Sequence, residues 1–316
     1  MAILPKPVTP KPLTGILLKV MSVAIFVAMQ TFIKAAGQLP PGQIVFFRSF
    51  FAMLPIVIML AYQRELATAF HTERPVGHIM RGIIGVSSMM LGFFALTRLP
   101  MPEAIMLNYA QPLLIVVISA VVLGETVRIF RWTAVVIGLI GVLIITWPKL
   151  TLFTSGEGFG NAEAAGVVAA LIAAGISAIA LLQVRSLVAT ERSSTIVMWF
   201  SMTASVAGLL TLPFGWAPMS TAQVLLLIGA GIAGGVAQIL MTEAYRHASV
   251  ATVAPFEYTS ILFGSVVGYW IFSDVPTIHA VIGGSIVVGS GLLIIWREQR
   301  LGLERARAAK VAPPQG

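Results

Sequence analysis

The sequence contains no cysteine, and only 10% of its residues carry a charge. Without thiols the chain can form neither a disulfide framework nor a thiolate metal site. Its four histidines are scattered and show no H-x₃-H spacing, so a zinc centre is not expected. We therefore predict no metal site and no cofactor.

The sequence also lacks the short motifs of nucleotide-driven and hydrolytic proteins. It has no G-x₄-G-K-[ST] phosphate loop, so ATP-driven transport by this chain is not expected. It has no G-x-S-x-G, no H-E-x-x-H and no acidic metal cluster. We predict that the protein is not an enzyme, and keep a membrane-embedded enzyme or a channel subunit as the alternative of another class.

Apolar residues are abundant, at 58% of the chain. A helix of about 20 apolar residues crosses the ~30 Å hydrocarbon core of a bilayer. Ten such runs are present, and they predict an all-α membrane protein with ten transmembrane helices. The runs lie near 13–36, 42–62, 76–97, 102–123, 129–147, 162–184, 194–214, 222–245, 250–272 and 277–296.

The net charge of +8 does not indicate nucleic-acid binding, because the basic residues lie in short gaps between apolar runs and in the C-terminal tail 297–316. Such flanks face anionic headgroups, so the lipid bilayer is one expected partner. The repeat described below predicts a small-molecule substrate as the other. Positive flanks are retained in the cytoplasm. With both termini cytoplasmic, fourteen lysines and arginines lie on that side and only Lys34, Arg98 and Lys149 on the other.

An internal repeat appears when the chain is shifted by 149 residues, which aligns 82–147 with 231–296 without a gap. Tyr109 then meets Tyr258, and Trp147 meets Trp296. Each half holds five predicted helices, and an odd number requires opposite orientations in the membrane. We predict two inverted five-helix repeats, 13–147 and 162–296, joined by a linker at 148–161. Transporters commonly bind substrate near the midplane between such halves.

These features resemble the EamA family of the drug/metabolite transporter superfamily. The resemblance covers residues 13–298 and rests on ten spans in two halves, on QTFIKAAG and FFRSFFAMLP, and on VVLGETVRIFRWTAVVIGLIGVLII. The second half departs from the pattern, with Asp274 where the family has Gly-Glu. The resemblance implies a bacterial inner-membrane carrier with a central cavity lined by helices one, three, four, six, eight and nine. The opening of the chain is similar to riboflavin transporters of this family, while other members carry amino acids, S-adenosylmethionine or drugs.

Glu257 interrupts the apolar run 250–272, and an ionisable side chain at bilayer depth normally faces a cavity or a partner. The repeat places Asn108 at the matching position of the first half, and each is followed by a tyrosine. Two interpretations stay open for Glu257: a clamp between helices, or a cavity residue that contacts substrate or a proton. The candidates for substrate binding or coupling are Gln30, Arg48, Asn108, Tyr109, Gln111, Gln238, Glu257 and Tyr258.

Other charged residues have simpler interpretations. Glu243 lies three residues before Arg246 and predicts a local ion pair. Lys34 is expected either to extend its ammonium to the membrane–water interface or to contact substrate. Arg48 lies deeper and needs a partner that the sequence does not identify.

The aromatic and amide side chains suit a flavin ring, which needs stacking faces and hydrogen bonds at its edge. A zwitterionic amino acid would instead need a cation paired with an anion, which Arg48 or Lys34 with Glu257 also supply. We predict a secondary transporter working by alternating access, with riboflavin uptake as the first candidate and amino acids, S-adenosylmethionine or drugs as alternatives.

Overall fold

A computed structural model describes residues 11–311 apart from 123, 125, 126, 128, 151–160, 189 and 249. Every regular element in this part of the chain is helical. The elements are α1 (Pro12–Ala35), α2 (Pro41–Tyr62), η1 (Leu66–Thr68), α3 (Pro75–Leu96), α4 (Met101–Asn108), α5 (Ala110–Val122), α6 (Ile129–Leu150), α7 (Ala162–Val188), α8 (Ser193–Leu209), η4 (Leu212–Phe214), α9 (Thr221–His247), α10 (Val250–Val253), η5 (Ala254–Tyr258), α11 (Thr259–Phe272) and α12 (Ile278–Val311).

Local sequence explains where several helices begin. Proline occupies the first turn of α1, α2, α3 and α4, where its missing N–H costs no helical hydrogen bond. α9 begins with a capping box, in which the Ser220 side chain and the Gln223 side chain each bond the other residue's backbone N–H.

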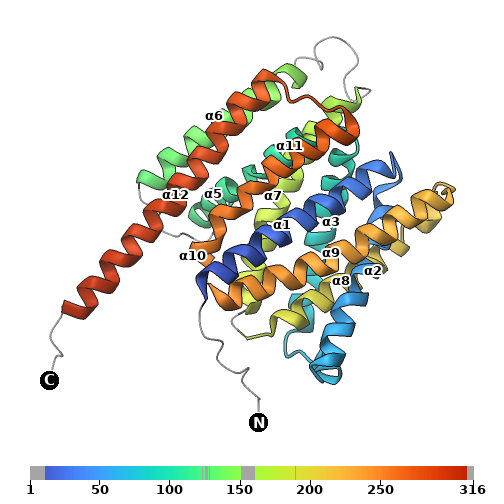
Figure 1. Ribbon diagram of the computed structural model, residues 1–316, viewed down its shortest axis with the longest axis horizontal. Helices are drawn as coiled ribbons and strands as arrows, with labels where there is room; N and C mark the ends of the chain where they lie inside the picture. The colour runs from blue at the N-terminus through green and yellow to red at the C-terminus, as the bar shows by residue number, and fades with distance from the viewer. Residues whose placement is uncertain are drawn as a thin grey trace.

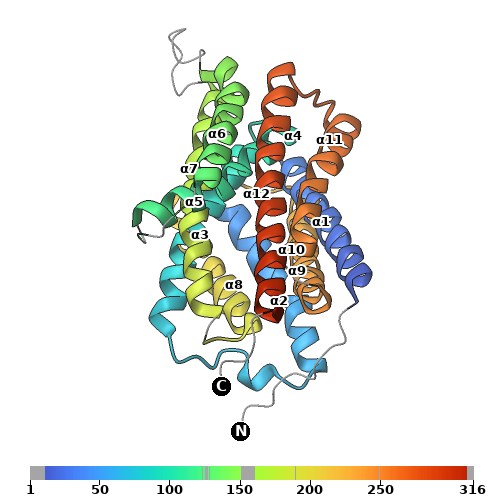
Figure 2. The ribbon, with the colours of Figure 1, turned by 90° about the vertical axis from the view of Figure 1, so that its left-hand side faces the viewer.

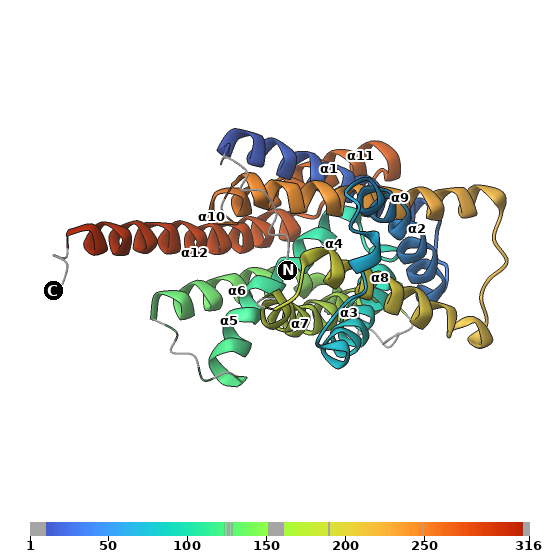
Figure 3. The ribbon, with the colours of Figure 1, turned by 90° about the horizontal axis from the view of Figure 1, so that it is seen from below.

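The helices run side by side in a bundle (Figure 1). α1 packs along α9, α3 along α7, α2 against α8 and α6 against α12. Figure 3 shows α1 and α9 on one side of the molecule and α3 and α7 on the other. The start of α1 and the end of α12 lie at the same end of the bundle (Figure 2).

In the described part of the chain, nine helices are long and apolar enough to span a membrane, counting Met101–Val122 as one. The protein is therefore a multi-pass membrane protein. The tenth predicted span, 250–272, is divided into α10, η5 and α11 and does not reach this length, so the count of ten stays a prediction. Residues 151–160 of the predicted linker and Glu125 lie outside the described residues. α12 continues to Val311, so the predicted tail is helical over 297–311.

Two spans are interrupted at corresponding places. Pro112 has no N–H to donate to the Asn108 carbonyl, and the helix divides there into α4 and α5. Pro255 likewise stands where α10 gives way to the 3₁₀ helix η5, which ends at Tyr258. The predicted repeat relates Asn108 to Glu257, so both interruptions fall at matching positions of the two halves.

α6 and α12 approach closely through glycine. A Cβ added to Gly283 would lie 2.4 Å from the Gly141 carbonyl oxygen, and one added to Gly141 would lie 2.7 Å from the Gly283 oxygen. Such small residues let two membrane helices come together at backbone distance. At the same crossing Gly138 contacts Ser290 and Gly141 contacts Val287. These two contacts are related by the 149-residue shift, which places Gly138 on Val287 and Gly141 on Ser290.

We expect Gly283→Ala to lower the thermal stability of the detergent-purified protein by several degrees, because the added methyl overlaps the Gly141 backbone and overpacking costs about 1–3 kcal/mol. Gly289→Ala is the matched control on the same helix, since nothing lies within 4 Å of its added Cβ. Equal melting temperatures for both variants would show that the α6–α12 crossing is not tight.

Candidate functional site

An ion pair between α1 and the interrupted span is the most unusual feature inside the bundle. The Lys19 ammonium donates to the Glu257 carboxylate. The Lys19 side chain is 1% exposed, whereas that of Glu257 is 46% exposed. The buried cation is thereby compensated, and one face of the carboxylate stays open to another ligand.

Tyrosines from the two interrupted spans meet beside this pair. The rings of Tyr109 and Tyr258 stack with centroids 4.6 Å apart. The Tyr109 hydroxyl donates to the backbone carbonyl of Glu257 over 2.6 Å and lies 2.6 Å from the Ser260 hydroxyl. Tyr109 thus holds the backbone of the second interruption, and in this arrangement the stacked faces cover each other.

Four predicted amide residues have side chains that accept or donate no hydrogen bond within the described part of the chain: Gln30, Asn108, Gln111 and Gln238. Asn108 is exposed at the first interruption, and the other three are half-buried. An amide carries two donors and two acceptor sites, so these side chains are available to solvent or a ligand.

Arg48 does not join the Glu257 cluster through any ion pair. It is half-buried in α2, and its guanidinium lies beside Gly234 of α9, where an added Cβ would be 3.4 Å from Nε. The Arg48 Nε is buried without a hydrogen-bond partner among the described residues. The zwitterion arrangement of Arg48 or Lys34 with Glu257 is therefore absent from this conformation.

A second ionic network closes the end of the bundle where α1 ends and α2 begins, which we call the Lys34 end. The Lys34 ammonium donates to Asp274 over 2.7 Å and to the Leu99 carbonyl over 2.6 Å. Asp274 also accepts from the Met101 N–H over 2.8 Å, which satisfies the start of α4. Asp274 thus caps a helix that lies far from it in the sequence.

Glu103 forms a further buried cluster at the Lys34 end. Its side chain is 1% exposed and lies 2.5 Å from the Lys149 ammonium, which also pairs with Glu163 at 2.9 Å. Thr277 donates to Glu103 over 3.2 Å. Together with the Lys34 network, this cluster joins α1, α4, α6, α7 and the segment before α12.

The opposite end is held by contacts between loops. Glu191 accepts from the Thr72 hydroxyl over 2.7 Å and from the Glu73 N–H over 3.2 Å. Burial would raise the pKa of Glu191, but these hydrogen bonds and nearby His78 outweigh it and lower the pKa below its usual value. The contact therefore stabilises the fold at neutral pH, and its contribution is lost as the pH falls through the pKa of Glu191.

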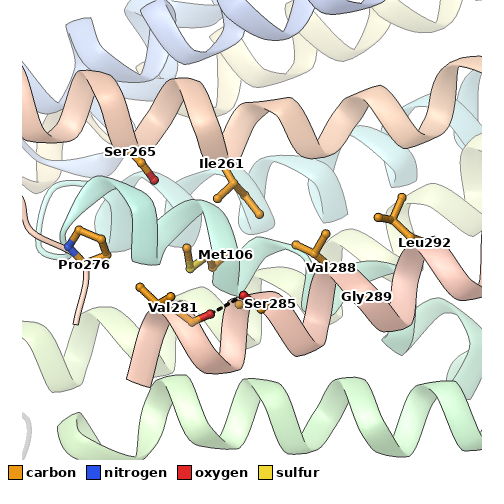
Figure 4. Close-up of a pocket in the computed structure, with 10 residues that line it drawn as sticks. Met106, Ile261, Ser265, Pro276, Val281, Ser285, Val288, Gly289 and Leu292 are labelled. Carbon is orange, nitrogen blue, oxygen red and sulfur yellow. Dashed lines mark hydrogen bonds between the residues drawn. The ribbon is translucent and has the colours of Figure 1, made fainter. Parts of the chain in front are cut away.

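A groove separate from these clusters opens between α4, α11 and α12 (Figure 4). It has a volume of about 460 Å³ and is lined mostly by apolar side chains, with Ser265 and Ser285 as polar members. The Ser285 hydroxyl is already used by the Val281 carbonyl at 2.7 Å. The groove contains none of the predicted site residues.

Sequence reasoning missed Lys19 and Glu103. A charged side chain within a membrane span normally needs an opposite charge. Lys19 lies within the first apolar run, so it could have been considered as the partner of Glu257. The predicted Glu243–Arg246 pair is confirmed at 2.7 Å. In the described part of the chain, no group of three His, Asp or Glu residues is arranged to hold a metal ion.

Comparison with known proteins places this geometry in context. A model of the EamA-like transporter family matches residues 13–147 and 164–296. The chain is 28% identical over 281 residues to the pseudopaline exporter CntI of Pseudomonas aeruginosa, covering 87% of this chain and 93% of the exporter. It is 26% identical over 261 residues to an S-adenosylmethionine uptake transporter of Rickettsia prowazekii, covering 82% and 84% of the two chains.

A riboflavin transporter of Rhizobium johnstonii is 28% identical over 263 residues, covering 83% of each chain. A solved crystal structure at 20% identity shares the fold with a TM-score of 0.60, covering 91% of this chain and 98% of the other. These relatives are named for different cargoes and for both uptake and export.

Proposed function

Because this chain belongs to the EamA-like transporter family, we propose that it is a secondary transporter that moves a small metabolite across the bacterial inner membrane by alternating access. The observation that carries the proposal is the meeting of two interrupted spans inside the bundle, with the Lys19–Glu257 pair at one interruption and the unbonded Asn108 side chain at the other. Interrupted helices of this kind form substrate and ion sites at the midplane of secondary transporters.

Alternating access needs two halves that can move against each other. The pairing of α1 with α9 and of α3 with α7 supports the inverted repeat, because a shift of 149 residues relates one pair to the other. The related contacts at the α6–α12 crossing support it as well. We propose ten spans with cytoplasmic termini, so that the Lys34 end faces away from the cytoplasm and is closed in this conformation.

The cargo does not follow from the family, since the relatives include named carriers of pseudopaline, S-adenosylmethionine and riboflavin. Riboflavin uptake stays our prediction from the resemblance. Tyr109 and Tyr258 stack on each other in this conformation, so a flavin ring could insert between them only if the two rings separated.

Transport by purified protein in liposomes tests the function. We expect saturable uptake of a labelled metabolite from a panel containing riboflavin, amino acids, S-adenosylmethionine and carboxylates, with exchange stimulated by unlabelled substrate inside. Exchange stimulation distinguishes a carrier from a channel, which conducts without saturating at low concentration. Uptake that is unsaturable, or chemical conversion of the substrate, would contradict the proposal.

A further inference from the structure

Arg48 is a cation inside the bundle without a counter-ion. Its Nε is buried and unbonded, and no described carboxylate lies within ion-pair distance of the guanidinium. Met29 and the bare backbone of Gly234 are its neighbours. Because a membrane-buried charge normally pairs or faces an aqueous cavity, its missing partner points to a ligand.

Arg81 is a second cation in the same condition. Its Nε and Nη1 are buried without hydrogen-bond partners among the described residues. Arginines near the end of a span usually extend toward the interface. Arg81 instead lies along its own helix toward Gly85, one turn deeper, with its guanidinium 4.5 Å from the Phe200 ring centre. Stacking on an aromatic ring stabilises the cation but does not neutralise it.

Other charged side chains within the described spans have ion-pair partners. Lys19 pairs with Glu257, and Glu103 pairs with Lys149. Arg48 and Arg81 have no such partner among the described residues, and each has buried nitrogen atoms without a hydrogen bond.

Both arginines border one region of the bundle. Met29, which neighbours Arg48, and Phe200, which carries Arg81, belong to the same hydrophobic cluster. Arg48 lies seven residues after the start of α2 and Arg81 six after the start of α3, and these helices run in opposite directions. At 1.5 Å per residue, each is therefore roughly 10 Å from an opposite end of the bundle.

We propose that Arg48 and Arg81 bind the anionic group of the transported substrate, which therefore carries a carboxylate or a phosphate. The inference rests on the proposed transport function and names its substrate class. A guanidinium binds either group through two parallel hydrogen bonds, a geometry that an ammonium does not reproduce. Cations on opposite sides of the midplane suit a site that must receive an anion from one face and release it to the other. A neutral flavin ring would leave both charges uncompensated, so this inference favours an anionic cargo over riboflavin, the first candidate from the family resemblance.

The test compares related probes with and without an anionic group. Succinate and succinamide have similar shapes, and flavin mononucleotide differs from riboflavin by one phosphate. We expect succinate or flavin mononucleotide, at millimolar concentration, to raise the melting temperature of the detergent-purified protein, and their neutral counterparts to have no effect. Stabilisation by the neutral members alone, or by none of the anions, would overturn the proposal.

Substitutions separate a substrate role from a structural one. Arg48→Met and Arg81→Met are expected to leave the melting temperature unchanged or raised, because each removes an unpaired buried charge. Each should also remove the shift caused by the anion and lower liposome uptake about 10- to 100-fold, the effect of losing hydrogen bonds to a charged group. Arg48→Lys should retain part of the binding.

Arg246→Met is the matched control, since Arg246 is exposed and pairs with Glu243. It should change neither binding nor uptake. A marked fall in the melting temperature of both interior variants without loss of the anion effect would show structural roles and overturn the proposal. Anion-dependent stabilisation without uptake would keep the anion site and contradict the transport function instead.

Discussion

Lys19→Met is expected to abolish transport and to lower the melting temperature by several degrees. The Lys19 side chain is 1% exposed, and its substitution leaves the Glu257 carboxylate without its cation inside the bundle. Removing one partner of a fully buried ion pair costs about 3–5 kcal/mol. The Glu257 carboxylate left behind is 46% exposed, so solvent screening should hold the loss below that range. Uptake into liposomes and thermal unfolding in detergent measure the two effects separately.

The double variant Lys19→Met with Glu257→Gln separates stability from function. Removing both charges should restore most of the stability, since a neutral replacement of a buried pair is often neutral or stabilising. Transport should stay low if the pair handles substrate or a proton. Arg246→Met, which breaks an exposed pair, should cost no more than about 1 kcal/mol. Full uptake and unchanged stability in Lys19→Met would show that the pair has neither role.

Most of the fold could be predicted from the sequence, because transmembrane helices appear there as long apolar runs. Nine of the ten predicted runs correspond to helices long enough to cross a membrane. The run 250–272 differs because Pro255 and the residues up to Tyr258 form a 3₁₀ segment that hydropathy does not register. Pro112 gave a comparable signal for the first interruption, although a single proline does not distinguish a kink from a break.

The candidate site was readable only in part. The predicted repeat relates Tyr109 to Tyr258, and the two rings stack on each other in the structure. It could not give the partner of Glu257, because Lys19 lies 238 positions away in the chain and several cations were available. The sequence also does not show in which direction a long side chain extends. In the structure Lys34 pairs with Asp274, and Arg81 extends toward the bundle interior rather than toward the membrane interface.

Asp274→Ala is expected to open the Lys34 end and to reduce transport about 10-fold or more. The substitution removes the acceptor of both the Lys34 ammonium and the Met101 N–H. A loss of 1–3 kcal/mol from one conformation shifts the balance between two conformations by about 5- to 150-fold. The closed form should therefore be depleted, and the cycle slowed at the step that re-forms it.

Cysteine labelling measures the opening directly, since the chain has no cysteine of its own to remove. Thr31→Cys places a thiol at a position that is 8% exposed, near Met101. We expect slow labelling from outside the cell in the otherwise unchanged protein and fast labelling when Asp274→Ala is added. Glu163→Gln, which alters the half-exposed second partner of Lys149, is the control and should change the rate little. Equal labelling with and without Asp274 would contradict the closure.

α12 has a mechanical consequence, because it passes from the predicted span into the tail as one unbroken helix from Ile278 to Val311 (Figure 1). The 14 residues after Arg297 form a rigid arm of about 21 Å at 1.5 Å per residue. A tilt of about 10° in the span would swing the tip of this arm by about 4 Å, given that length. The tail is therefore a lever that amplifies movements of the bundle, and a fluorophore near its end would report each transport cycle from outside the membrane.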